Sequence, residues 1–271
     1  MRIKITLQTK QIPFIYRHRI LSLIKEALKK SDQDYKSFLY ENKIAKPFTF
    51  NLVPPINKEI REALIQIDSK FKIKDKVFYS EDGYFSLFIS SNDYRFIISL
   101  FNGLKRLKTF DFSSYENMLV DGERVIIQIK NVTMINEKPI KKDTVIFKTN
   151  SPILIEDKND NPLLFSDKNF EEELNTITNK ILSSPHIKGK GLEKPLKFEP
   201  INMNKQVVKH TLKSFREQTG KPVMYLTGNV GIFKLSGDPR DLEILYKIGI
   251  GNRTGQGFGM VEVLEWWKRF I

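Results

Sequence analysis

The sequence predicts an α+β protein built from two tandem ferredoxin-like domains, each with the RRM-like element order βαββαβ. Strand-like alternation and helix-like periodicity follow one another in this order twice along the 271 residues. A polar stretch at 136–143, which contains Pro139, separates the two series. We therefore predict an N-terminal domain over residues 1–136 and a C-terminal domain over residues 137–271. No self-similarity relates the two halves, so the prediction depends on the element pattern.

The first series of elements occupies the N-terminal half. Residues 2–8 alternate polar and apolar side chains, as a strand with one buried face does. The helix that follows carries apolar residues on one face and charged residues on the other. Glu81-Asp82-Gly83 is a hairpin signal between two strand patterns. The predicted elements are strand 2–8, helix Tyr16–Lys30, strand Phe48–Leu52, strands 71–80 and 84–90, helix 92–106 and strand Val125–Val132.

The second series starts after residue 143. Its first helix is acidic and amphipathic, and its second helix is short and begins at Asp238. The predicted elements are an extended segment 144–155, helix Asn169–Leu182, strands or hairpins at 196–213 and 222–235, helix Asp238–Ile248 and strand Phe258–Leu264.

Positive charge is concentrated in two segments. The net charge is +13; residues 1–50 hold eleven Lys or Arg against four acidic residues, and residues 183–214 hold seven Lys against two. The rest of the chain is nearly neutral. Clustered positive charge is typical of a protein that binds a polyanion such as nucleic acid. A lysine-rich surface that only serves solubility is the alternative.

The composition excludes several classes of protein. The chain has no cysteine, which excludes a disulfide scaffold, a thiol nucleophile and a Cys-ligated zinc site. No apolar run approaches the ~18 residues that span a bilayer, and the N-terminal segment lacks the apolar core of a signal peptide. His18, His186 and His210 are scattered, and no Asp/Glu/His spacing indicates a metal site. We expect a cytoplasmic protein with no membrane partner, no metal and no cofactor.

A glycine-rich loop from Gly249 to Gly259 is the strongest local signal. Its five glycines in eleven residues cost conformational entropy, so they need a reason. Glycine lets consecutive backbone N–H groups approach an anion such as a phosphate. The loop follows a helix and precedes a strand, the reverse of the dinucleotide fingerprint and the P-loop. A helix C-cap with a tight strand entry explains two glycines but hardly five, so we interpret the loop as a phosphate-binding feature.

Four stretches resemble the CRISPR-associated endoribonucleases that process precursor crRNA, a family of the repeat-associated RNA-binding superfamily with ferredoxin-like folds. The loop, with Gly-hydrophobic-Gly, five residues and again Gly-hydrophobic-Gly, is similar to the family's C-terminal signature. The resemblance covers nearly the whole chain in the right order. The other similar stretches are Gly231–Asp238, Phe147–Ile153, and the N-terminal run of Leu21–Leu28, Phe38-Leu39-Tyr40-Glu41 and Lys46-Pro47-Phe48-Thr49-Phe50.

The resemblance implies an endoribonuclease that binds CRISPR repeat RNA and cuts it without a metal ion. A ribose 2′-hydroxyl would attack the adjacent phosphate, leaving a 2′,3′-cyclic phosphate and a 5′-hydroxyl. This reaction needs a base for the 2′-hydroxyl, an acid for the leaving oxygen and cations for the phosphate. The expected partner is precursor crRNA; interference complex subunits are further candidate partners, and a homodimer stays open.

This sequence matches the family's catalytic pattern in part. Lys46 stands at the position of the family's Lys, but Tyr40 replaces its His and Lys25 replaces its Tyr. Free Tyr and Lys titrate at about pH 10, so neither is a ready base at neutral pH. Either Lys25 and Lys46 stabilise the phosphorane while Tyr40 donates a proton, or the protein binds repeats without cutting them. His18 is the best substitute base, although a single helix-terminal His is more often structural.

The resemblance also predicts RNA-binding residues. In the family, the region equivalent to the Lys-rich segment 183–214 grips the RNA, although a solvated hairpin would also be rich in Lys. A structural subunit of a CRISPR interference complex is an alternative function. A nucleotide-binding metabolic enzyme fits less well, because of the element order around the loop. The predicted RNA-binding residues are Gly249, Gly251, Asn252, Arg253, Thr254, Gly255, Gln256, Gly257, Gly259, Lys188, Lys190 and Lys194.

Overall fold

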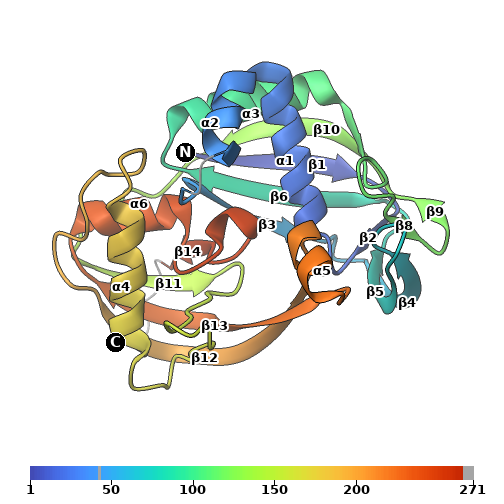
Figure 1. Ribbon diagram of the computed structural model, residues 1–271. Helices are drawn as coiled ribbons and strands as arrows, with labels where there is room; N and C mark the ends of the chain where they lie inside the picture. Colours follow the sequence, from blue (N-terminus) through green and yellow to red (C-terminus); the bar gives the residue numbers. More distant parts are fainter. Residues whose placement is uncertain (42–43, 265–271) are drawn as a thin grey trace.

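The computed structural model describes residues 1–41 and 44–264, and its strands form three antiparallel sheets. The first sheet lies beneath the helices of the N-terminal half (Figure 1). Its elements and helices are β1 (Arg2–Gln8), α1 (Arg17–Ser31), α2 (Gln33–Glu41), β3 (Phe48–Val53), β6 (Tyr84–Ser91), α3 (Tyr94–Leu107), β7 (Thr109–Asp111) and β10 (Ile126–Ile135). The strand order is β3-β6-β1-β10-β7. Without the edge strand β7, this is the order of a ferredoxin-like unit.

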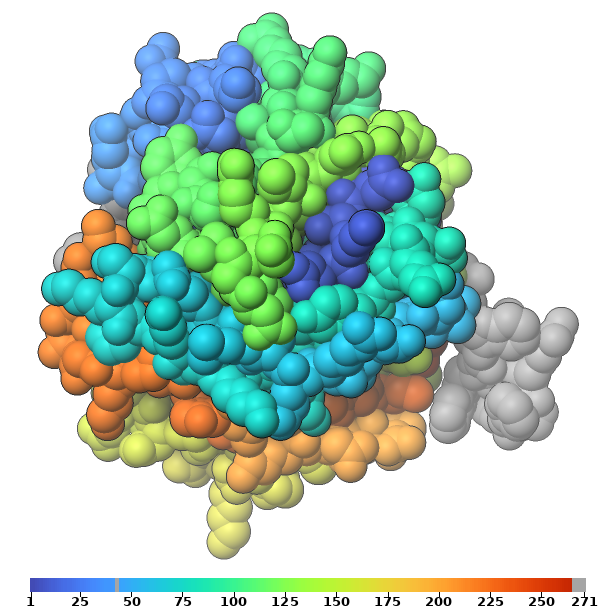
Figure 2. Space-filling view, turned by 90° about the vertical axis from the view of Figure 1, so that its right-hand side faces the viewer, coloured from blue at the N-terminus to red at the C-terminus, as the bar shows by residue number. Residues whose placement is uncertain are grey.

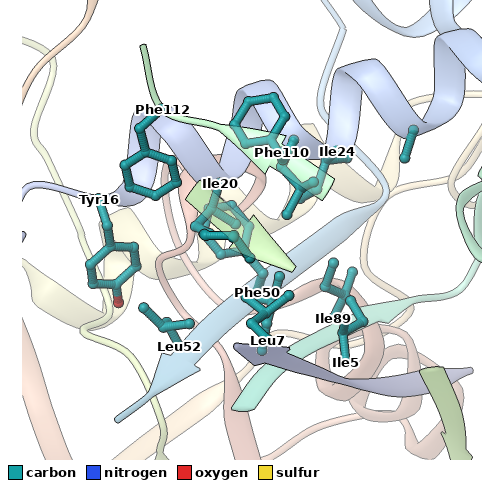
Figure 3. Close-up of a cluster of buried hydrophobic side chains, with 14 of the residues drawn as sticks. Ile5, Leu7, Tyr16, Ile20, Ile24, Phe50, Leu52, Ile89, Phe110 and Phe112 are labelled. Atoms are coloured by element: carbon teal, nitrogen blue, oxygen red, sulfur yellow. The ribbon is translucent and has the colours of Figure 1, made fainter. Parts of the chain in front are cut away.

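The alternation predicted for residues 2–8 places every second side chain in the core. Ile5 and Leu7 of β1 are fully buried and face Ile20 and Ile24 of α1 (Figure 3). Helices α1 and α3 approach each other closely because Gly103 has no side chain: a Cβ there would lie 1.8 Å from the Ala27 carbonyl oxygen. Close packing of apolar side chains between sheet and helices is what stabilises this unit.

A second sheet is inserted between the strands of the first unit. The hairpin predicted around Glu81-Asp82-Gly83 is wrong, because the strands on either side of this turn belong to different sheets. Its strands are β2 (Gln11–Pro13), β4 (Glu59–Gln66), β5 (Lys72–Tyr79), β8 (Leu119–Val120) and β9 (Glu123–Arg124), in the order β2-β5-β4-β8-β9. β5 pairs with β2 and β4, whereas β6 pairs with β1 and β3, so the two strands do not form a hairpin. The turn instead docks on the chain after β1, where the Thr9 N–H donates to the Gly83 oxygen at 2.9 Å.

The third sheet repeats the order of the first. Its elements are β11 (Thr144–Thr149), α4 (Phe170–Leu182), β12 (Lys197–His210), β13 (Met224–Ser236), α6 (Pro239–Ile248) and β14 (Val261–Val263). The strand order β12-β13-β11-β14 corresponds, strand for strand, to β3-β6-β1-β10. The prediction of two tandem ferredoxin-like units is confirmed. The boundary proposed at 136–137 falls between β10 and β11 and stays a prediction.

A long hairpin joins the second unit to the first. β12 and β13 extend beyond their sheet, and the helix between them, α5 (Lys213–Thr219), lies beside the start of α1 (Figure 1). The buried Arg216 of α5 pairs with Asp68 at 2.7 Å and with Glu116 at 3.2 Å. In Figure 2 the orange residues of this hairpin lie against the cyan residues of the inserted sheet. None of the described helices is long and apolar enough to cross a membrane.

Candidate functional site

Three of the four predicted catalytic residues lie together. Lys25 comes from α1, Tyr40 from α2, and Lys46 from the segment before β3. The Nζ atoms of Lys25 and Lys46 lie 4.6 Å and 5.3 Å from the centre of the Tyr40 ring. The Tyr40 hydroxyl is buried and makes no hydrogen bond within residues 1–41 and 44–264. A buried hydroxyl without a partner beside two cations is a feature that a bound anion would explain.

The surroundings change the proton affinity of all three groups. Burial, followed by the nearby charge of Lys36, lowers the pKa of Lys25. Burial and then Lys25 lower the pKa of Lys46, whose Nζ donates to the carbonyl oxygens of Leu39 and Ile44. Burial raises the pKa of Tyr40, so its hydroxyl keeps its proton. Tyr40 is therefore a proton or hydrogen-bond donor, and the loss of a proton is easier for both lysines than for a free lysine.

His18 lies at the N-terminus of α1 and is nearly fully buried. Its Nε2 atom is 3.6 Å from the Glu116 carboxylate. Burial, Arg19 and His210 lower its pKa well below the usual value, so the ring is neutral at pH 7. A surface cavity of about 260 Å³ is lined by Lys25 and Glu116 but not by His18. Glu116 thus lies between the imidazole and the cavity that Lys25 lines, and His18 itself does not reach that cavity.

The glycine-rich loop packs between the two units. A Cβ at Gly255 would lie 2.8 Å from the Lys46 Cβ, and a Cβ at Gly257 would lie 2.6 Å from the Phe50 ring. The Thr49 hydroxyl of β3 donates to the Phe258 oxygen at 2.8 Å. The glycines thus permit the loop backbone to approach other protein atoms closely. Gly255 packs against the aliphatic part of the Lys46 side chain.

The remaining predicted loop residues divide into bonded and open groups. Gly249, Gly251 and Gly259 are buried at positive φ, and Thr254 is buried in the 3-10 turn η1 (Thr254–Gln256). The side chains of Asn252 and Arg253 approach Glu156 at 3.4 Å, and the Gln256 amide oxygen lies 3.1 Å from His210. The successive N–H groups of residues 253–255 have no acceptor in the described part of the chain. These unpaired donors are the part of the loop with hydrogen-bonding capacity left for an anion, although Thr254 and Gly255 are buried.

The three predicted RNA-binding lysines differ in their surroundings. Lys188 is engaged in an ion pair with the fully buried Asp241 at 2.5 Å and with Glu193 at 3.2 Å. Lys190 and Lys194 are exposed. Lys188 therefore holds the segment against α6, and its charge is already compensated. For Lys190 and Lys194 the RNA-binding role stays a prediction.

Two residues near the site were not predicted from the sequence to belong to it. His186 of the second unit lies 2.5 Å from the Ala45 oxygen, next to Lys46, and its ring meets Phe38 of α2 edge-on. Arg17 donates from Nε to the Gly257 oxygen at 3.3 Å and lies over the Phe258 ring. Both contacts join segments more than 140 residues apart, so local spacing carries no signal for them. The described residues contain no group of three or more His, Asp or Glu that could hold a metal ion.

The fold, with its interdomain glycine-rich loop, defines the class first: a tandem ferredoxin-like protein. Residues 135–263 match the family model described as CRISPR associated protein Cas6, C-terminal. This part of the chain is similar to a Cas6 C-terminal domain. This match supports the relation to the CRISPR-associated endoribonuclease family that the sequence predicts. A search of curated proteins finds no match.

Solved structures share the whole architecture. A Cas6-related protein from Pyrococcus furiosus superposes with a TM-score of 0.72 at 23% identity, covering 98% of this chain and 99% of its own. A RAMP protein described as binding different RNA substrates gives 0.72 at 19% identity, covering 98% and 100%. A structure described as CRISPR associated protein Cas6 gives 0.68 at 24% identity, covering 98% and 99%. At these identities the likeness shows the fold.

Proposed function

We propose that the protein binds CRISPR repeat RNA and cuts precursor crRNA within its repeats. The Cas6 C-terminal match, the RNA-binding relatives of the same fold and the clustered positive charge support RNA processing. One observation supports cleavage: the ammonium groups of Lys25 and Lys46 converge on the ring of Tyr40. Two cations and a protonated hydroxyl form a suitable site for a phosphate that gains negative charge.

In the proposed reaction the nucleophile is the 2′-hydroxyl of the RNA, so neither a protein nucleophile nor a bound metal is required. The oxygen attacks the adjacent phosphorus, the bond to the 5′-oxygen breaks, and a 2′,3′-cyclic phosphate remains. Lys25 and Lys46 stabilise the phosphorane, and Tyr40 donates to the phosphate or to the leaving oxygen. His18, His186 and a neutral Lys25 are the candidates for the base.

A relative that binds repeats without cutting them is the second candidate function. The observation that favours it is the raised pKa of Tyr40, which removes this residue as a base at neutral pH. Losing one acid or base costs about 10²–10⁴ in rate. A role as a structural subunit of an interference complex, with other subunits or a second copy as partners, also remains a prediction.

The decisive experiment incubates the protein with the repeat RNA of its own organism in the presence of EDTA and maps the ends. We expect one cut per repeat, a 2′,3′-cyclic phosphate and a 5′-hydroxyl. A 2′-deoxy substitution at the cut should abolish cleavage and leave binding nearly unchanged. Binding without any cut would contradict the endoribonuclease and leave the second candidate function.

Variants then locate the active site. Lys46→Ala and Lys25→Met should each slow single-turnover cleavage by about 10²-fold or more, since each removes a fixed cation. Lys105→Ala, on α3, is the control and should cut at the normal rate. Tyr40→His should raise the rate by restoring the residue that the family pattern carries. Loss of one limb of the pH–rate profile in His18→Ala or His186→Ala would identify the base. Normal cleavage by all these variants would show that the active site lies elsewhere.

A further inference from the structure

A groove of about 420 Å³ opens where the β12–β13 hairpin passes the inserted sheet. Phe78 lines it from β5, Phe14 from the turn after β2, Val207 from β12, and Arg17 from the start of α1. None of its lining residues belongs to the cluster around Tyr40. Its volume falls in the range of about 300–1,000 Å³ that small-molecule and cofactor sites occupy, so it can hold one nucleotide of a longer strand.

The groove is lined by an aromatic stack, of which Phe78 also packs against the edge of the core. The rings of Phe14 and Phe78 lie 4.2 Å apart at an interplanar angle of 25°. Both side chains are only half-buried, and the exposed Lys76 stands beside them on β5. An accessible aromatic face next to a cation is the arrangement on which unpaired nucleic-acid bases stack.

Arg17 supplies the second observation. Its side chain is only 8% exposed, yet no carboxylate in residues 1–41 or 44–264 bonds to it. The Nε atom donates to the Gly257 oxygen, and the guanidinium lies 4.7 Å from the centre of the Phe258 ring. The two terminal nitrogens make no hydrogen bond within the same part of the chain, and the residue lines the groove.

A largely buried cation without a carboxylate partner favours an anion beside it, because the anion would compensate its charge. The planar fork of an arginine fits the oxygens of a phosphate in a bidentate manner. Lys209, on the other wall, is already paired with Asp75 at 2.8 Å. Arg17 and Lys76 are therefore the groups at this groove whose positive charge an anionic ligand would compensate.

We propose that this groove is a nucleotide subsite for the repeat RNA, remote from the cluster around Tyr40. One unpaired base stacks on the Phe14–Phe78 pair, and the Arg17 fork binds the adjoining phosphate. The segment bound here is single-stranded, because base faces inside a duplex are covered by their neighbours. The glycine-rich loop contributes to this subsite by holding Arg17 through Gly257 and Phe258. The inference rests on the proposed function, since the RNA is its occupant.

The test measures the dissociation constant of the full-length protein for repeat RNA by fluorescence anisotropy at fixed salt. Phe78→Leu removes the aromatic face and keeps the apolar volume, and Arg17→Met removes the charge and keeps the packing. Each should weaken binding by about 5- to 100-fold, the range measured when one base–aromatic stack is lost. Phe101→Leu and Arg106→Met, both on α3, are the matched controls and should bind normally.

A second readout identifies the nucleotide. Repeat RNAs with 2-aminopurine at successive positions should include one position whose fluorescence is quenched by wild type and the controls but not by Phe78→Leu. Thermal melting checks that each variant is folded, and Phe78→Leu decides the matter if Arg17→Met does not fold. Normal affinity and unchanged quenching in folded Phe78→Leu would overturn the subsite alone. Failure of the wild-type protein to bind repeat RNA would overturn both the subsite and the proposed function.

Discussion

Replacing Gly257 with alanine tests whether the glycine-rich loop is a packing element as well as a binding element. Gly257 has φ +86°, a conformation that L-residues rarely adopt, and its added Cβ would lie 2.6 Å from a carbon of the Phe50 ring. The ring is fully buried, so it cannot turn away into solvent. The variant therefore combines backbone strain with overpacking at the contact between the two units.

The size of the effect follows from these two contributions. A non-glycine residue at positive φ costs about 1 kcal/mol or more, and forcing an extra methyl group into a packed core costs about 1–3 kcal/mol. Their sum is about 2–4 kcal/mol. A chain of this size loses roughly 2 °C of melting temperature per kcal/mol. Gly257→Ala should therefore lower Tm by about 4–8 °C.

Gly122 provides the matched control. It has φ +82°, but a Cβ there would meet nothing within 4 Å. Gly122→Ala contains the strain without the clash and should lower Tm by only about 2 °C. Differential scanning calorimetry of both variants, with the repeat-RNA affinity measured alongside, separates the two roles of the loop. Equal melting temperatures for the two variants would refute the packing argument.

Three further predictions concern charge. Repeat-RNA affinity should fall with salt at a logarithmic slope of about −0.7 per neutralised phosphate; a flat titration would contradict the polyanion argument. Burial lowers the pKa of His210 from 6.5 to about 3, so the unfolded chain binds more protons between these values, and the free energy of unfolding should fall as the pH drops below 6.5. Urea unfolding at pH 7 and pH 5 should show a smaller loss for His210→Gln; an equal loss would exclude this histidine as a cause. Lys188→Met should lower the free energy of unfolding by about 3–5 kcal/mol by leaving Asp241 buried without its cation; urea unfolding like that of Lys190→Met would show that the pair is dispensable.

The elements that the sequence predicts best are those with one clearly buried face. The alternation of β1 and the helical spacing of α1 correspond to residues whose apolar sides meet in one core. The strand Glu59–Gln66 was missed because its first four residues are exposed, which leaves little apolar alternation. The seven-residue helix α5 was missed because its burial depends on Arg216. The partners of this side chain, Asp68 and Glu116, lie far upstream in the sequence.

In the candidate site, too, the sequence did not predict the features that depend on residues far apart in the chain. The family pattern placed Lys25, Tyr40 and Lys46 in one site, and the structure brings these three side chains together. Whether they catalyse a reaction stays a prediction. The sequence alone indicated open glycines for phosphate approach, whereas most of them are close to protein atoms. Arg17 looked like an ordinary helix-start residue, because its burial depends on Gly257, 240 residues away.

Arg2 links nearly the full length of the chain. Its guanidinium donates to the Val261 oxygen at 2.9 Å, bonds the Glu262 carboxylate and lies 4.5 Å from the centre of the Tyr246 ring. These contacts, across 259 and 260 residues, close very large loops, and such loops are entropically slow to form. During synthesis the contacts of Arg2 in β1 can therefore form only after β14, the last strand, has been made. Weakening it should accelerate unfolding and leave the rate of folding almost unchanged.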